Sequence, residues 1–373
     1  MFYGSESLSY LKGADPYRER PATVLGTDDE RGILHAIFEV VTNSTDEVSE
    51  GYGKEVILNV FQDGSVEVKD FGRGVPMGWN SIEKKYAWEI VFCTMYGSGK
   101  FDSSNYKKSA GLNGIGDTAA QFTSEYMDVT SVRDEIKNRT VDKKGNEHLE
   151  LHRVRYEMHF VKGYPVGELK EEIVDNTTPT GTTIKFKPDI EVFKGAESIR
   201  IPVEQYVTKL RQKAMISAGV KFVLNYFGRD PIVLIYKGGI KEYLDQVIKS
   251  KVTSNFIEVG TEGLGQDREN GETYKAYCDV VFSFSKDSPI FECYHNQEEL
   301  GLGGSSSDAF RASVVKFFNA YGKLAKDDRL IWKDFADITT CVLSTFCPGH
   351  LTSWLGQTKD AINNKFIGEL VKD

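Results

Sequence analysis

An apolar segment early in the chain carries polar side chains at helical spacing. Glu39, Asn43, Asp46 and Glu47 are separated by four, three and one residues, and His35 lies one turn before Glu39. At about 100° per residue these side chains share one side of a helix. The intervening Ile, Leu and Val residues then form the opposite, core-facing side. This pattern predicts a long helix with a polar stripe.

The helix is expected to run from about residue 30 to 50, because Asp28 or Asp29 can cap its start and Gly51 can end it. A polar stripe is usually a solvated face. Such a face commonly includes Lys or Arg one turn from each acid, yet neither occurs between Leu34 and Gly51. Uncompensated carboxylates beside an asparagine also suit a metal ion or a general base, so both interpretations remain open here.

The composition is that of a globular chain. Its 373 residues, 40% hydrophobic and 27% charged, suggest two domains with their own cores. A net charge of −9 does not indicate a nucleic-acid-binding protein. Any DNA contact would have to be made by a small part of the surface or through a partner. The five cysteines form no CxxC pair, and we expect reduced thiols in a cytoplasmic protein. No signal peptide or membrane span is evident.

Alternating and helical patterns predict two α+β domains of unequal size, with a boundary near Asp230. The expected strands are 55–61 and 65–70 (a hairpin), 126–133, 149–161, 182–187, 220–227, 232–236, 273–285, 290–295 and 338–346. The expected helices, besides the first, are 81–96, 117–124, 203–218, 308–325 and 331–337. Residues 141–148 are expected to form a long exposed hairpin tip.

The sequence DFGRGVP, residues 70–76, follows one predicted strand. Gly72 and Gly74 lack Cβ atoms, so a flat ligand could approach the backbone closely. Asp70 accepts hydrogen bonds when ionised, which suits an exocyclic amine such as N6 of adenine. The alternative is a plain turn in which Asp70 caps backbone amides.

A glycine-dotted segment, SAGLNGIGD, precedes the helix expected at residue 117. Gly111, Gly114 and Gly116 could expose N–H groups to an anion at the helix N-terminus. The segment is not a P-loop and lacks the preceding strand of a dinucleotide fingerprint. A flexible loop is the alternative, although Lys100 and the Lys107-Lys108 pair favour phosphate.

These segments occur in the order typical of the GHKL ATPases, which include gyrase, histidine kinases and MutL. The chain resembles one branch in detail, the B subunits of bacterial DNA gyrase and topoisomerase IV. The resemblance covers nearly all 373 residues. It is carried by YLKGADPYRERP, LHAIFEVVTNSTDEVSEG, VKDFGRGVP, GSGKFDSSNYKKSAGLNGIG, TPTGTTIKFKPD and GQTKDAINNK.

The resemblance implies a fold and a domain plan. We expect a GHKL (Bergerat) sandwich of helices on a mixed sheet, followed by an α+β transducer domain of ribosomal-S5-like type. The arm that joins two subunits would be residues 1–20, the ATP-binding domain 21–229 and the transducer 230–373, which carries the QTK loop. Because whole subunits of this family are longer, the chain is expected to be an N-terminal ATPase-plus-transducer fragment.

The resemblance also assigns catalytic roles. Glu39 matches the general base that activates water against the γ-phosphate of ATP, and His35 matches the histidine that holds it. Asn43 matches the ligand of Mg²⁺. Lys359, with Gln357 beside it, matches the lysine that the transducer sends to the γ-phosphate.

The remaining site residues are implied as nucleotide contacts. Asp70 matches the residue that reads adenine, Thr182 supports it, and Arg73, Gly74 and Pro76 would line the pocket. Tyr3 matches a tyrosine that reaches the partner subunit's nucleotide. The other expected contacts are Glu47, Lys100, Ala110, Gly111, Leu112, Asn113, Gly114, Ile115 and Gly116, the last seven in a loop that would close over the phosphates.

The chain departs from the family pattern in several places. The usual RPGMYIG reads RPATVLG from Arg20, Thr42 replaces an aspartate, and the histidine of the closing loop is Asn113. The GGT segment of the transducer ends in Ser305. None of these changes removes a catalytic group, but they leave gyrase and topoisomerase IV both open.

The expected function is the ATP-operated gate of a type IIA topoisomerase, with no DNA cleavage of its own. Expected partners are a second copy on ATP binding, the DNA-cleaving A-type subunit, and duplex DNA facing Arg311. The alternatives are another GHKL enzyme, such as a kinase or a mismatch-repair ATPase, or a nucleotide-binding regulatory module without turnover. A kinase would need a phosphoacceptor helix before the ATP domain, and mismatch-repair relatives lack K-F-D and Q-T-K in this arrangement.

Overall fold

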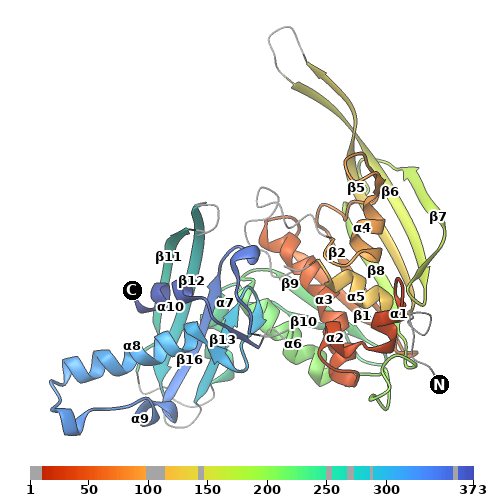
Figure 1. Cartoon of the computed structure of the whole chain (residues 1–373). Helices are drawn as coiled ribbons and strands as arrows, with labels where there is room; N and C mark the ends of the chain where they lie inside the picture. The colour runs from red at the N-terminus through yellow and green to blue at the C-terminus, as the bar shows by residue number, and fades with distance from the viewer. Residues whose placement is uncertain are drawn as a thin grey trace, which may run out of the picture. The chain divides into compact units, whose positions relative to one another are not determined.

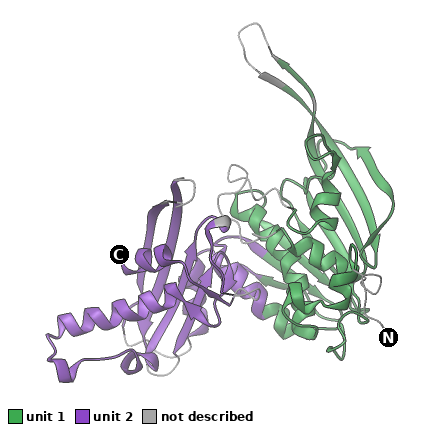
Figure 2. Cartoon of the chain, in the orientation of Figure 1, with its two compact units in different colours: residues 1–99, 113–207, 222–233 green, residues 100–112, 208–221, 234–373 purple. Residues whose placement is uncertain are grey.

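The computed structural model describes residues 11–97, 114–141, 147–248, 254–266, 273–285, 289–355 and 360–373. The chain divides into two compact units, shown in Figure 2. Unit 1 comprises residues 1–99, 113–207 and 222–233, and unit 2 comprises residues 100–112, 208–221 and 234–373. Within the described part, no helix is both long and apolar enough to pass through a bilayer.

Unit 1 is built on an eight-stranded sheet with the strand order β10-β9-β1-β2-β8-β5-β6-β7 (Figure 1). Side chains of β1 and β2 alternate between buried and half-buried, as expected when one sheet face is covered. The strands are β1 (Glu55–Val60), β2 (Val66–Asp70), β5 (Ser124–Val141), β6 (Glu147–Val161), β7 (Tyr164–Ile173), β8 (Gly181–Pro188), β9 (Lys221–Tyr226) and β10 (Ile232–Leu234).

The central helix of unit 1, α3, packs against β1, β2 and β8 and contacts the shorter helices α2 and α5, while α1 and α4 contact α5. It begins where the sequence predicts, because the Asp29 carboxylate accepts a hydrogen bond from the Arg31 N–H. The helices are α1 (Asp15–Glu19), α2 (Ala22–Leu25), α3 (Glu30–Ser49), α4 (Ala87–Cys93) and α5 (Gly116–Phe122), followed by α6 (Val203–Ile216), which continues from unit 1 into unit 2.

The predicted hairpin of β1 and β2 is confirmed, with antiparallel pairing from Val56↔Asp70 to Val60↔Val66. The helix expected over residues 81–96 is wrong in its first part. A small hairpin of β3 (Trp79–Asn80) and β4 (Lys85–Tyr86) occupies that stretch, because the Asn80 side chain accepts from the N–H groups of Ile82 and Glu83 and forms a turn.

Unit 2 contains a five-stranded mixed sheet of order β11-β12-β16-β13-β14, in which β13 and β16 run parallel. Helices α8 and α10 pack together, and α10 also contacts β11 and β12. The strands are β11 (Ile257–Gln266), β12 (Thr273–Phe284), β13 (Ile290–His295), β14 (Glu298–Glu299), β15 (Gly303–Gly304), β16 (Thr339–Phe346) and β17 (Ala361–Ile362). The helices are α7 (Gly239–Val247), α8 (Ser305–Tyr321), α9 (Lys333–Ala336) and α10 (Lys365–Lys372), with 3₁₀ turns η3 (Lys326–Asp328) and η4 (Gly349–Leu351).

The expected α+β class is therefore confirmed, although the sequence patterns did not predict several of the elements. Strand β7 lies at the sheet edge with nearly every side chain exposed, so it has no alternation of apolar residues to detect. Others are the helices α1, α2, α7 and α10, the strand β11, and the two-residue strands β14, β15 and β17. The division into an arm and two domains stays a prediction.

Candidate active site

Helix α3 is buried almost all round, which changes the meaning of its polar stripe. From Gly32 to Val48 every residue is buried except His35, Glu39, Asn43 and Glu47, which are partly exposed. These four residues are each separated by one turn. A solvated face would be wider than one line of side chains. The stripe is therefore a narrow polar line at the edge of the core.

Asp46 does not belong to this line. The sequence places it on the same side as Glu39, but its exposed fraction is 0%. Around the helix axis Asp46 lies only about 20° from Glu39, so its position on the helix does not explain its burial. The packing of the surrounding fold buries its carboxyl.

His35 and Glu39 are in direct contact. The imidazole Nε2 lies 3.1 Å from Glu39 Oε1, and Nδ1 lies 3.0 Å from the Leu25 carbonyl oxygen. The carbonyl can only accept, so Nδ1 carries a proton. The other nitrogen faces the Glu39 carboxylate, and a hydrogen bond between them needs one further proton on either group. The ring fixes the carboxylate and can exchange a proton with it.

The first residue of α5 packs against the same carboxylate. A Cβ atom on Gly116 would lie 2.4 Å from Glu39 Oε2 and 3.1 Å from Glu39 Cβ. Only glycine fits at this position without displacing Glu39. The sequence singled out Gly116 for its backbone N–H, and the structure adds a steric reason for the glycine.

Asp70 lies at the end of β2 with 4% of its surface exposed. Oδ1 accepts from the backbone N–H groups of Gly72 (2.9 Å) and Thr182 (3.1 Å), and Oδ2 accepts from the Ser44 hydroxyl (2.9 Å). Burial raises the pKa of Asp70 to about 6, although these three bonds oppose the shift. Asp70 thus caps backbone amides, as the alternative interpretation holds.

Glu47 is engaged by Arg73. The Arg73 guanidinium donates to both carboxylate oxygens of Glu47 at 3.0 and 2.9 Å, and the Arg73 backbone N–H donates to Oε2 at 3.0 Å. The guanidinium also lies 4.2 Å from the centre of the Tyr52 ring. A Cβ on Gly72 would be 2.8 Å from the Glu47 side chain. The space at Gly72 is therefore filled by Glu47, which corrects the expectation that it admits a flat ligand.

The turn after Asp70 is fixed by residues from distant strands. Thr182 Oγ1 accepts from the Val75 N–H at 3.0 Å, and the Ser131 hydroxyl donates to the Val75 carbonyl at 2.7 Å. A Cβ on Gly74, whose φ is +80°, would lie 2.5 Å from the Val132 carbonyl oxygen. Gly74 is thus required by its backbone conformation and by close strand packing.

Sequence reasoning missed two residues here. Arg133 on β5 donates from Nη1 to the Gly74 carbonyl (3.3 Å), and its Nε lies 2.9 Å from Glu135 Oε1. Ser44 on α3 holds Asp70, as described above. Ser44 follows the conspicuous Asn43 directly, and its position one turn from Glu47 is the only signal that the sequence offers.

Several predicted site residues lie outside the described part of the chain. Pro76 is described and exposed, and Gly114 and Ile115 directly precede α5. The residues outside are Tyr3, Lys100, Ala110, Gly111, Leu112, Asn113, Gln357 and Lys359.

Unit 2 pairs the two segments that the family resemblance singles out. Gly303 and Gly304 form β15, which pairs in parallel with Ala361 and Ile362, one residue beyond the Q-T-K sequence. A Cβ on Gly304 would lie 2.2 Å from the Ile362 carbonyl oxygen, so glycine is required. Arg311, on α8, stacks over the rings of Phe291 (4.8 Å) and Trp332 (5.6 Å), with its side chain 38% exposed.

Among the described residues, no group of three or more His, Cys, Asp or Glu side chains is arranged to hold a metal ion. A magnesium ion does not need such a cage, because it commonly uses one or two protein oxygens together with substrate phosphates and waters. Asn43, one turn from Glu39 and partly exposed, fits that type of site.

Comparison with known proteins gives consistent relatives. Residues 239–373 match the family model for DNA gyrase B. The B subunit of DNA gyrase from Thermotoga maritima is 31% identical, over 99% of this chain and 55% of that protein. The B subunit of DNA topoisomerase 4 from Staphylococcus aureus is 29% identical, over 96% of this chain and 51% of that protein. The chain thus spans about half the length of these relatives.

Solved structures show the same fold. The ATPase domain of Thermus thermophilus gyrase B superposes with a TM-score of 0.67 at 22% identity, covering 97% of this chain and 87% of that one. The topoisomerase IV ATP-binding domain of Francisella tularensis gives a TM-score of 0.66 at 22% identity, covering 98% and 91%. The chain is thus similar in sequence to the B subunits of DNA gyrase and topoisomerase IV, and it has the fold of these ATPase domains.

Proposed function

We propose that this chain binds and hydrolyses ATP and acts as the ATP-operated gate of a type IIA DNA topoisomerase. The observation that carries the proposal is the polar line on α3. On an otherwise buried helix, only His35, Glu39, Asn43 and Glu47 reach the surface between Gly32 and Val48, and Glu39 is held by His35. The named relatives, gyrase and topoisomerase IV B subunits, support the same function.

In the proposed reaction Glu39 orients the attacking water and accepts its proton, and His35 holds the carboxylate in place. Gly116 lies against the Glu39 carboxylate and limits its movement on that side. Lys359 would stabilise charge that develops on the γ-phosphate, with Gln357 beside it. A magnesium ion held by Asn43 and the phosphates would neutralise phosphate charge.

Nucleotide recognition is proposed at the turn after β2. Asp70 would accept a hydrogen bond from the adenine amine, while Ser44, Gly72 and Thr182 hold its carboxylate in place. The wall of this pocket would be the turn of Arg73, Gly74 and Pro76, which Arg133 supports from β5. The loop Ala110–Gly116 and Lys100 would contact the phosphates.

The larger assembly is also a proposal. Residues 1–20 would form an arm through which two copies join on ATP binding, with Tyr3 reaching the partner's nucleotide, residues 21–229 the ATP-binding domain, and residues 230–373 the transducer. Arg311 would face a captured DNA duplex, and an A-type subunit would supply DNA cleavage. The non-hydrolysing regulatory module remains the second candidate, because Asp70 and its partners alone would bind a nucleotide.

Steady-state ATP hydrolysis by the purified chain tests the proposal, with Glu39→Gln as the variant. We expect Mg²⁺-dependent turnover that falls by about 10²–10⁴ in Glu39→Gln, the usual contribution of a general base. Affinity for a non-hydrolysable ATP analogue should stay within a few-fold. Binding without any turnover in the wild type, with or without the A-type subunit and DNA, would favour the regulatory module.

Light scattering tests the gate. The chain should be monomeric with ADP and dimeric with the ATP analogue, and removal of residues 1–14 should abolish the dimer while the monomer stays folded. An unchanged mass with and without the analogue would contradict the gate mechanism.

A further inference from the structure

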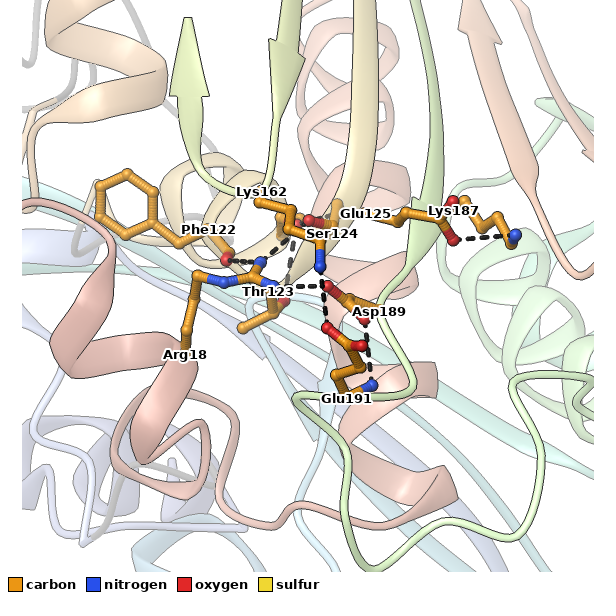
Figure 3. Close-up of polar contacts among 10 residues, drawn as sticks. Arg18, Phe122, Thr123, Ser124, Glu125, Lys162, Lys187, Asp189 and Glu191 are labelled. Carbon is orange, nitrogen blue, oxygen red and sulfur yellow. Dashed lines mark hydrogen bonds and ion pairs between the residues drawn. The ribbon is translucent and has the colours of Figure 1, made fainter.

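A buried ion pair lies at the far end of α5 from Glu39. Arg18 on α1 pairs with Asp189, and the two side chains are only 15% and 4% exposed (Figure 3). The neighbouring ion pair Lys162–Glu191 is 51% and 71% exposed. An exposed pair contributes little. In a buried pair, by contrast, removing one partner leaves the other charge uncompensated in the interior. The buried Arg18 guanidinium therefore depends on Asp189 and on the other hydrogen-bond acceptors around it.

Arg18 and Asp189 together bind three consecutive carbonyl groups where α5 ends and β5 begins. Arg18 Nη1 donates to the carbonyls of Phe122 (2.9 Å) and Ser124 (3.0 Å), and the backbone N–H of Asp189 donates to the Thr123 carbonyl (3.0 Å). Carbonyl groups at a helix C-terminus carry partial negative charge and favour a cation. The pair therefore clamps the end of α5 (Figure 3).

Helix α5 is short and rigidly packed between the clamp and Glu39. Its seven residues span about 10 Å. Residues Thr118 to Phe122 are buried, the Thr118 hydroxyl donates to the Val91 carbonyl (2.9 Å), and Tyr17 stacks on Phe122 with ring centres 5.3 Å apart. A close-packed element transmits displacement because its surroundings do not compress. A shift at Phe122 must therefore move Gly116 against the Glu39 carboxylate.

We propose that Arg18, held by Asp189, is a positioning residue for Glu39 and acts through α5. The proposal rests on the proposed function in taking Glu39 as the general base. It also connects residues 11–20 to the hydrolytic carboxylate, because α1, which carries Arg18, begins at Asp15 and contacts α5. Conformational change in that segment is thereby linked to hydrolysis.

The test compares Arg18→Gln and Asp189→Asn with Lys162→Gln, which removes the exposed neighbouring pair and leaves Arg18 and Asp189 in place. In steady-state ATP hydrolysis we expect kcat to fall about tenfold in the first two, a usual size for coupling between two sites. KM should change by less than about twofold, because the hydrogen-bond partners of Arg18 are Phe122, Ser124 and Asp189, and none of these is proposed to bind the nucleotide. The double variant should be no slower than either single variant, because the two residues act as one unit.

Hydrogen exchange of the amides of residues 116–122 gives a readout independent of activity. Exchange should quicken about tenfold in Arg18→Gln and Asp189→Asn and stay unchanged in Lys162→Gln. Unchanged kcat and exchange in a folded Arg18→Gln variant would overturn the proposal. So would a parallel loss of kcat and thermal stability at constant α5 exchange, which would indicate a purely structural pair.

The two proposals fail separately. A wild-type chain without ATP hydrolysis contradicts the proposed function, and the exchange measurement still decides whether Arg18 and Asp189 hold α5. Normal hydrolysis in all variants leaves the proposed function intact and overturns the positioning role.

Discussion

Two histidines, one in each unit, have opposite surroundings. His35 is partly exposed and contacts the Glu39 carboxylate. His295 has an exposed fraction of 0%, and its nitrogens face hydroxyl groups: Nδ1 lies 2.9 Å from Thr345 Oγ1, and Nε2 lies 3.1 Å from Thr352 Oγ1. The Cys347 thiol lies 3.6 Å from the same Nε2.

These surroundings assign different protonation to the two rings. The Thr345 hydroxyl donates to the Tyr294 carbonyl and therefore accepts from Nδ1–H of His295, which leaves Nε2 as an acceptor. Burial lowers the pKa of His295 to about 3, so this ring stays neutral. Burial also raises the pKa of Cys347 to about 11, so its thiol is unreactive. A histidine beside a cysteine can thus be structural, whereas a histidine beside a partly exposed carboxylate can serve chemistry.

The largest effect should come from His295→Ala, measured by urea unfolding. The change leaves a cavity and removes one hydrogen-bond partner each from the Thr345 and Thr352 hydroxyl groups, so the free energy of unfolding should fall by about 3 kcal/mol. The control is His159→Ala, because His159 is 42% exposed and pairs with an exposed Asp128; its stability should hardly change. Equal stability of the two variants would show that the buried network contributes nothing.

His35→Ala should behave in the opposite way to His295→Ala: it should lower catalysis and leave stability nearly unchanged. The effect is expected to be smaller than that of His295→Ala. Because Glu39 keeps its carboxylate but loses the group that orients it, we expect kcat for ATP hydrolysis to fall about 10- to 100-fold, as when an outer-sphere partner is removed. Unfolding should change little, since the ring is partly exposed. Wild-type kcat in this variant would break the contrast between the two histidines.

The contrast also shows what sequence could supply. The helix of residues 30–50 and its polar line follow from spacing and from the absence of basic residues, both local features. Which members of the line reach the surface does not follow, because the neighbours that bury Asp46 come from elsewhere in the fold. The role of Gly72 was misjudged for the same reason, since Glu47 fills the space beside it.

Long-range partners were the least predictable part. Ser44 and Asp70 are 26 residues apart, and Arg18 and Asp189 are 171 residues apart. No periodicity links such pairs. Family resemblance identified Asp70 and Thr182, yet it did not indicate that the Thr182 hydroxyl accepts from Val75 while its backbone N–H binds Asp70.

Asp70 extends the comparison to pH, with an effect of about tenfold in nucleotide affinity. Its pKa is about 6, and the adenine amine would need the ionised carboxylate. Binding should therefore release a proton near pH 6, and affinity should fall about tenfold between pH 7 and 5, where the ionised fraction falls by that factor. Calorimetry in buffers of different ionisation enthalpy measures the proton. Asp70→Asn should bind weakly and lose this pH dependence, and a wild-type profile in that variant would leave Asp70 as a turn cap only.

Asp70 should affect stability in the opposite direction to affinity: ionisation of Asp70 favours nucleotide binding but lowers the free energy of unfolding. The pH dependence of stability can therefore be compared with that of His295. From about pH 4 to 6 folded Asp70 keeps a proton that the unfolded chain has released, so the free energy of unfolding falls as pH rises through this range. For His295 the unfolded chain binds the extra proton below about pH 6.5, so its contribution falls as pH decreases. Unfolding curves of Asp70→Asn and His295→Ala against pH should deviate from the wild type in opposite directions.

The smallest effect should come from Glu47→Gln, the last position of the polar line. Glu47 is held by the guanidinium and the N–H of Arg73, whose side chain is 35% exposed, so solvent screens part of the charge. We expect the free energy of unfolding to fall by about 1 kcal/mol, because one oxygen still accepts from Arg73. Affinity for the ATP analogue should weaken only about threefold, since Glu47 would act on the nucleotide through the Gly72–Gly74 turn. A loss of binding as large as that in Asp70→Asn would instead place Glu47 in direct contact with the nucleotide, as the family resemblance implies.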